Sequence, residues 1–272
     1  MALPTPSATS TCLVTGASSG IGREIARELA GRGLGVTLVA RRGELLEELA
    51  GELRSAQGVR VEVIAADLAE EEQRDALAAE VDARGLVVDL LVNNAGFTTM
   101  GPVHRGSRRR ELAVVRVNVE AVVDLCTRFV PPMTTRRRGA VLNTASTAAF
   151  QPLPGQAAYA ASKAFVLSYS QALGAELGGT GVTVTALCPG PVETGFGEAS
   201  GLSDDQAAEA LPRIMWVPPG EVARAGIEGV EKGRPVVVPG TANRFTAVAG
   251  SLVPRRLLLP LLARRHPAMG AR

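Results

Sequence analysis

Short apolar runs alternate with amphipathic segments along the first 240 residues. Within each run the apolar residues are nearly continuous, which is typical of strands buried on both faces of a parallel sheet. We expect seven such strands, at residues 11–15, 35–40, 59–66, 87–92, 140–145, 182–188 and 235–238. Apolar residues that recur every three or four positions predict helices between them, at residues 21–31, 44–56, 70–83, 107–130, 156–177 and 221–231.

The regular alternation of strand and helix predicts a single α/β domain at residues 11–240. We expect a doubly wound, Rossmann-like fold, in which helices cover both faces of a mostly parallel seven-stranded sheet. Residues 1–10 are expected to be a flexible N-terminus. Residues 195–218 are expected to be irregular or partly helical.

Residues 241–272 form a C-terminal extension beyond the last predicted strand. Within it, residues 252–265 are strongly apolar and carry flanking arginines, a composition that suits a segment lying on a membrane surface. Pro254 and Pro260 would interrupt a long amphipathic helix there. Packing on the substrate side or on a partner subunit is therefore the favoured interpretation, and contact with a membrane surface is the alternative.

Composition and charge exclude several classes of protein. The net charge of +2 is too small to indicate nucleic acid as a partner. The three cysteines and two histidines are far apart, so we expect neither a disulfide framework nor a metal site. Residues 1–10 lack the basic and apolar regions of a secretory signal, and no apolar run reaches the roughly 18–20 residues that span a bilayer. We therefore expect a cytoplasmic protein.

Candidate ligand-binding residues follow the predicted strands, and ligands of such sheets bind beyond the carboxyl ends of the strands. The first strand runs into a glycine turn, T-G-x-x-x-G-I-G at residues 15–22, whose N–H groups can approach a pyrophosphate. The second strand runs into Arg41 and Arg42, where NAD-binding proteins carry a carboxylate for the ribose 2′-hydroxyl. Because arginine binds a 2′-phosphate well, NADP(H) is favoured over NAD(H).

A tyrosine and a lysine share one face of the helix predicted at residues 156–177. The chain has only two lysines and two tyrosines, and Lys163 follows Tyr159 by four positions. An ammonium beside a phenol favours the phenolate and lowers the pKa of the tyrosine. The pair suits a tyrosine that acts as a general acid and base. On this spacing alone, a core tyrosine and a surface lysine that share a helix are the favoured alternative, and the motifs at the other strand ends reverse that preference.

Further motifs stand in order at the remaining strand ends and helices. They comprise Asp67 with Leu68; Asn93, Asn94, Ala95 and Gly96; Asn118; Asn143, Thr144, Ala145 and Ser146; and Pro189, Gly190, Pro191, Val192, Glu193 and Thr194. Together with the glycine turn and the Tyr159–Lys163 pair, they make the chain resemble the classical short-chain dehydrogenase/reductases over about residues 10–240.

The resemblance implies a role for each matching residue. Tyr159 would exchange a proton with the substrate oxygen, and Lys163 would lower its pKa and bind the nicotinamide ribose. Ser146 would hydrogen-bond the substrate oxygen, and Asn118 would hold a water of a proton relay. The implied cofactor contacts are Gly16, Ser18, Ser19, Gly20, Ile21, Gly22, Arg41, Arg42, Asp67, Leu68, Asn94, Ala95, Gly96, Tyr159, Lys163, Pro189, Gly190, Val192 and Thr194.

The sequence departs from the family pattern at three places. The fifth strand ends in N-T-A-S where the family often has N-I-S-S, but the serine is kept. Ser19 stands where many NADP-preferring members have a basic residue, so specificity would depend on Arg41, alone or with Arg42. Residues 195–201 are unusually rich in glycine for the segment that covers the substrate, and we expect a mobile lid there.

The expected function is an NADP(H)-dependent exchange of hydride between nicotinamide and a hydrophobic ketone or secondary alcohol. A 3-oxoacyl, steroid, terpenoid or polyketide substrate would suit the apolar residues expected around the pocket: Phe97, Met100, Phe150, Leu153, Pro154, Phe196 and Trp216. One alternative is a membrane-associated lipid carbonyl reductase. Another is a non-catalytic nucleotide-binding sensor, which the retention of Ser146, Tyr159 and Lys163 disfavours. The resemblance also implies a homodimer or homotetramer.

Overall fold

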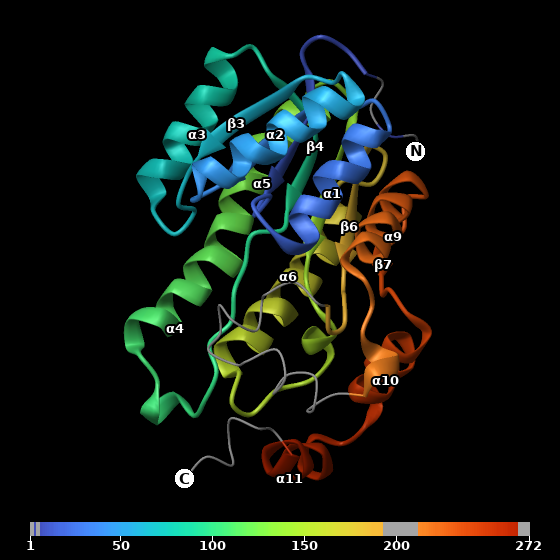
Figure 1. Ribbon diagram of the computed structural model, residues 1–272. Coiled ribbons are helices and arrows are strands. Elements are labelled where there is room, and N and C mark those ends of the chain that lie inside the picture. The colour runs from blue at the N-terminus through green and yellow to red at the C-terminus, as the bar shows by residue number, and fades with distance from the viewer. Residues whose placement is uncertain (1–2, 4–5, 193–211, 266–272) are drawn as a thin grey trace.

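A parallel sheet forms the centre of the protein. The computed structural model describes Leu3, residues 6–192 and residues 212–265 (Figure 1). The seven strands lie in the order β3-β2-β1-β4-β5-β6-β7, and every neighbouring pair is parallel. Their bounds are β1 Ser10–Thr15, β2 Val36–Ala40, β3 Val61–Ala65, β4 Val87–Asn93, β5 Gly139–Thr144, β6 Val182–Leu187 and β7 Val236–Val237. The predicted Rossmann-like α/β fold is confirmed.

Helices cover both faces of this sheet (Figure 1). The α-helices are α1 Gly20–Gly31, α2 Gly43–Gln57, α3 Glu71–Ala83, α4 Arg108–Val115, α5 Ala121–Thr135, α6 Ala157–Glu176, α9 Pro219–Glu231, α10 Thr241–Leu252 and α11 Arg255–Arg265. Helices α1, α2 and α9 contribute their apolar residues to one core, and α3, α5 and α6 contribute theirs to the core on the other face. The nearly continuous apolar strands therefore have both faces buried, as their sequences predict.

The strand order reverses beside β1. The chain builds β1, β2 and β3 outward in one direction, then returns to place β4 on the other side of β1. The carboxyl ends of β1 and β4 therefore meet at the switch point, where ligands of doubly wound sheets bind.

The helix predicted at residues 107–130 is not one regular α-helix. Helices α4 and α5 are joined by a π-helical turn, η2, at Arg116–Glu120, and the N–H of Ala121 donates to the carbonyl of Arg116, five residues earlier. Helix α5 also extends to Thr135, past the predicted end at residue 130, and contains Pro131 and Pro132. In that last turn the hydroxyls of Thr134 and Thr135 donate to the carbonyl of Pro131. Sequence periodicity did not reveal the π turn.

Two helices follow the sheet at its C-terminal end. Helix α10 packs against the short 3-10 helix η3, Thr147–Phe150, which follows β5. It also contacts a second 3-10 helix, η4, Arg213–Met215. Within the described ranges, no helix is long and apolar enough to cross a membrane.

Candidate active site

The glycine turn after β1 is locked against the end of β4. The hydroxyl of Thr15 accepts hydrogen bonds from the backbone N–H groups of Asn94 and Ala95, at 2.9 and 3.0 Å. The side-chain amide of Asn94 donates to the carbonyl of Thr15 at 3.1 Å. Gly16 has a φ of +68°, and a Cβ on Gly22 would lie 2.4 Å from Asn94 Nδ2. Only glycine fits this approach, so the two motifs predicted from separate strands form one structural unit.

Thr15 was not among the predicted cofactor contacts. Its hydroxyl also donates to the carbonyl of Val92 at 3.1 Å, so Thr15 joins the end of β1 to the adjacent strand β4. The available signal was its position as the last residue of the strand, directly before the first glycine of the turn. Behind that turn, Gly20 begins α1 with a φ of +57° and Ile21 packs against the core.

Arg42, rather than Arg41, faces the glycine turn. The Arg42 guanidinium donates to the hydroxyls of Ser18 and Ser19, both at 3.1 Å. The Arg41 side chain is 74% exposed and its guanidinium lies 4.0 Å from the carboxylate of Asp67. Arg42 is therefore the arginine that the fold directs toward the first turn of α1, where the cofactor phosphates are expected.

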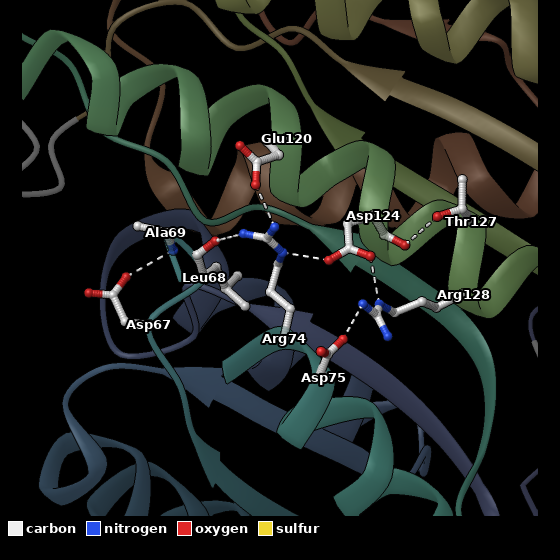
Figure 2. A network of polar contacts seen from close by, with 9 residues as sticks. All are labelled: Asp67, Leu68, Ala69, Arg74, Asp75, Glu120, Asp124, Thr127 and Arg128. Carbon is white, nitrogen blue, oxygen red and sulfur yellow. Dashed lines mark hydrogen bonds and ion pairs between the residues drawn. The ribbon is translucent and has the colours of Figure 1, made fainter. Parts of the chain in front are cut away.

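The buried side chain of Arg74 hydrogen-bonds the turn that follows β3 (Figure 2). Asp67 accepts from the N–H of Ala69 at 3.0 Å, and the carbonyl of Leu68 accepts from Arg74 at 2.8 Å. The Arg74 guanidinium also bonds Glu120 and Asp124, both at 2.5 Å. Arg74 thus ties the predicted adenine-binding turn to the helix that follows Asn118.

Asn118 lies within the π-helical turn and is completely buried. Its amide donates to the carbonyl of Phe97 at 3.1 Å and to the hydroxyl of Ser162 at 3.0 Å. Its amide oxygen accepts from the N–H of Phe97 at 3.2 Å. The side chain is thereby engaged in fixing the segment that follows Gly96, and π turns of this kind are common at functional sites.

Ser146, Tyr159 and Lys163 come together beyond the end of β5. Ser146 caps η3 by accepting from the N–H of Ala148 at 3.1 Å, and its hydroxyl shares a hydrogen bond with the Tyr159 phenol. The Lys163 ammonium donates to the carbonyl of Thr144 at 2.8 Å and lies 5.8 Å from the centre of the Tyr159 ring. Lys163 is only 5% exposed. The sequence therefore predicted a cluster that the fold assembles.

Burial shifts the pKa values of both groups in the direction that favours their uncharged forms. It raises the pKa of Tyr159 above its ordinary value, and the hydrogen bond with Ser146 offsets part of that rise. It lowers the pKa of Lys163 to about 8, and the nearby Cys188 thiol opposes that fall. The net shift of the Tyr159 pKa is therefore opposite in direction to the expected one, while the contribution of Lys163 itself stays a prediction. The i, i+4 spacing predicted the proximity of the two side chains, 5.8 Å from ammonium to ring centre, but desolvation is the largest influence on each pKa.

The loop after β6 depends on a residue that sequence analysis missed. The side chain of Asn243, from α10, is completely buried and donates to the carbonyls of Met215 and Pro239 at 3.0 and 3.1 Å. A Cβ on Gly190 would lie 2.3 Å from Asn243 Oδ1, so the loop and the helix are in close contact. The carbonyl of Pro189 accepts from the N–H of Thr147 at 2.8 Å. An asparagine more than 50 residues downstream gives no sequence signal for this contact.

The remaining predictions divide between described and undescribed residues. Val192 packs at the edge of one core. Thr194, Phe196 and the predicted lid at residues 195–201 lie outside the described residues. The other predicted pocket residues are half-buried: Phe97, Met100, Phe150, Leu153, Pro154 and Trp216. No group of histidine, cysteine and acidic side chains within the described ranges is arranged to hold a metal ion.

Known proteins place these features in a family. Residues 10–204 match the short chain dehydrogenase family. The chain belongs to the short-chain dehydrogenase family. It is 39% identical over 189 residues to a short chain dehydrogenase of Pseudocercospora fijiensis, covering 69% of this chain and 61% of that protein, less than two thirds of its length. A putative ketoacyl reductase of Streptomyces coelicolor is 39% identical over 225 residues, covering 78% of this chain and 86% of that protein.

A solved family structure extends the likeness to nearly the whole chain. It is a short-chain dehydrogenase from Sphingobium yanoikuyae in complex with NADPH, with a TM-score of 0.79 and 32% sequence identity. The alignment covers 92% of this chain and 95% of that one. Family membership therefore extends to the architecture that brings Ser146, Tyr159 and Lys163 together.

Proposed function

We propose that the chain is an NADP(H)-dependent oxidoreductase that interconverts a hydrophobic ketone and its secondary alcohol. The observation that carries the proposal is the hydrogen bond between the Ser146 and Tyr159 hydroxyls, with the buried Lys163 ammonium beside the phenol ring. Two hydroxyls so joined can both reach one carbonyl oxygen, one as a hydrogen-bond donor and the other as a proton donor.

The pKa shifts favour proton donation by Tyr159. A phenol whose pKa is raised stays protonated at neutral pH, as a proton donor to a ketone must. Lys163, with a pKa of about 8, is mostly charged at neutral pH and stabilises the phenolate left after transfer. Bound NADPH would supply the hydride that the carbonyl carbon accepts. Ser146 would donate a hydrogen bond to the carbonyl oxygen and so hold that oxygen beside the Tyr159 hydroxyl.

The glycine turn and the arginines of the second strand end support NADP(H) as the cofactor. The turn exposes N–H groups at the start of α1, and Arg42 lies against it on the side of the Ser18 and Ser19 hydroxyls. A guanidinium there suits a 2′-phosphate, and the structurally similar Sphingobium protein holds NADPH.

The substrate class follows from the apolar side chains beside the catalytic cluster. Phe150 and Leu153 lie between Ser146 and Tyr159 in the chain. Trp216 shortly precedes helix α9, which packs on β5, β6 and β7. The named relative that acts on ketoacyl groups is consistent with a 3-oxoacyl or polyketide-like ketone. A small charged metabolite would find few charged partners among these residues.

The test is NADPH oxidation with a panel of ketones, comparing the protein with Tyr159→Phe and Ser146→Ala. Removing the proton donor is expected to lower kcat about 10²- to 10⁴-fold, while NADPH affinity changes little. Lys163→Met should lower both kcat and NADPH affinity, because it would contact the cofactor ribose. Full activity in Tyr159→Phe, with no ketone preference, would contradict the proposed mechanism.

A further inference from the structure

Residues 232–272 differ sharply in charge from the rest of the chain. Residues 232–272 contain eight of the 29 basic residues and none of the 27 acidic ones. The preceding residues are therefore acidic overall, although the whole chain has a net charge of only +2. Charge asymmetry of this kind indicates a basic surface for an anionic partner.

Helix α10 presents apolar side chains to solvent. On its inner face, Asn243, Ala247 and Gly250 are buried against the catalytic domain. On its outer face, Phe245 is 75% exposed and Val248 is 59% exposed, one helical turn apart. Surface helices of globular proteins place mostly polar residues on this outer face, so the exposed Phe245 and Val248 depart from the usual pattern.

Neighbouring elements extend this surface. The 3-10 helix η4, which contacts α10, carries Ile214 with 78% of its side chain exposed and Arg213 exposed beside it. Directly after α10, Val253 is 38% exposed and Arg256 is exposed. We call this surface the α10 face: Arg213, Ile214, Arg244, Phe245, Val248, Val253 and Arg256.

The α10 face lies beside the catalytic cluster. The inner side of α10 packs on η3, which Ser146 caps, and a Cβ on Gly250 would lie 2.7 Å from the Gln151 amide. In Figure 1, α10 and α11 lie at the end of the molecule where the carboxyl ends of the strands point. A partner bound to the α10 face would therefore be next to the substrate entrance that the proposed function requires.

We propose that the α10 face docks the protein on an anionic membrane surface, with Phe245, Val248 and Ile214 inserted among the lipids. Exposed apolar side chains flanked by arginines are the chemistry of an interfacial helix. A second copy of this chain would oppose arginine to arginine on the same face, without an acidic residue after Glu231 to compensate, so self-association there is disfavoured. The sequence favoured packing of the extension; within the described residues, the inner side of α10 packs on η3 and its outer side is exposed.

The test uses the full-length protein and sedimentation with vesicles of phosphatidylcholine, with and without phosphatidylglycerol. We expect binding to the anionic vesicles that weakens as salt is raised, and little binding to the neutral ones. Phe245→Ser combined with Val248→Ser should weaken vesicle binding at least about tenfold, and Phe245→Leu combined with Val248→Ile should restore it. The distribution between pellet and supernatant is measured without any substrate, so it is independent of the proposed reaction.

A charge-matched pair of variants separates the α10 face from net charge. Arg213→Gln with Arg256→Gln should weaken binding about tenfold or more, whereas Arg224→Gln with Arg234→Gln, elsewhere on the surface, should change it much less. NADPH affinity, unchanged in all variants, reports an intact fold. Equal binding by Phe245→Ser with Val248→Ser would overturn the proposal. So would a serine variant that instead abolishes self-association, or specific capture of an acidic carrier protein without vesicle binding.

Discussion

Two buried cations, on helices that cover the same face of the sheet, are held in opposite ways. Arg74, between α3 and α5, is 2% exposed and bonds the carboxylates of Glu120 and Asp124 and the carbonyl of Leu68 (Figure 2). Lys163, on α6, is 5% exposed and bonds the carbonyl of Thr144. Within the part of the chain that the structure describes, Lys163 makes no ion pair with a carboxylate.

Their pKa values differ accordingly. Burial lowers the pKa of Arg74, but the hydrogen bonds to Asp124 and Glu120 outweigh that effect and leave it above its ordinary value. Burial lowers the pKa of Lys163 to about 8, with the nearby Cys188 as the opposing influence. A compensated buried charge holds structure, and an uncompensated one is kept available for chemistry.

The largest expected effect breaks the compensated site. Arg74→Leu should lower the free energy of unfolding by about 3 kcal/mol, because removing one partner leaves the other charges of a buried network unpaired. The loss falls at the lower end of the usual range because Asp124 keeps Arg128 at 2.6 Å and Glu120 is half exposed. Urea unfolding followed by circular dichroism measures it.

The control for Arg74 lies in the same network. Arg128→Met removes a more exposed guanidinium that also pairs with Asp124 and with Asp75. It should lower stability by less than about 1 kcal/mol, as exposed ion pairs do. Comparable losses in the two variants would show that the burial of Arg74 is not what makes it structural.

The second prediction tests the uncompensated site through pH. Because the folded pKa of Lys163 lies below the unfolded value of 10.5, the unfolded chain binds more protons between pH 8 and pH 10.5. Stability should therefore rise with pH in that window, by about 2 kcal/mol between pH 8 and pH 10, relative to Lys163→Met. Urea unfolding of both proteins across the window measures the difference. A difference that stays flat with pH would mean that Lys163 is compensated in solution.

The sequence predicted where the site would lie better than how its charges would behave. Parallel strands bring their carboxyl ends to one edge, so Gly16, Asn94, Ser146 and Gly190 could be placed together from the order of elements alone. Desolvation depends on everything packed around a group, and the spacing of Tyr159 and Lys163 contains none of that information. Their pKa directions were therefore beyond a reading of the motif.

Three structural features left no usable pattern in the sequence. Arg74 shares the buried face of α3 with Leu77 and Val81, but arginine is seldom buried, and its carboxylate partners come from a distant part of the chain. Asn243 comes from α10, beyond the last strand, and its contact with Gly190 depends on how α10 docks. The π turn around Asn118 is invisible to a period of 3.6 residues. Each of these three features depends on tertiary packing rather than on local sequence propensity.

The smallest expected effect extends the comparison to a third arginine. Arg42 donates to two uncharged hydroxyls, so its charge remains available to a 2′-phosphate, whereas the charge of Arg74 is already neutralised by carboxylates. Arg42→Ala should weaken NADPH binding about tenfold, as expected for a hydrogen bond to a charged group, and leave NADH binding nearly unchanged.

Arg41→Ala, which removes a guanidinium 4.0 Å from the Asp67 carboxylate, is the matched control and should have the smaller effect. Fluorescence titration with both nucleotides gives the two dissociation constants for each variant. If Arg42→Ala weakens the binding of NADPH and NADH equally, Arg42 supports the glycine turn through Ser18 and Ser19 and does not bind the 2′-phosphate. The distinction between available and neutralised arginines would then not extend to the cofactor site.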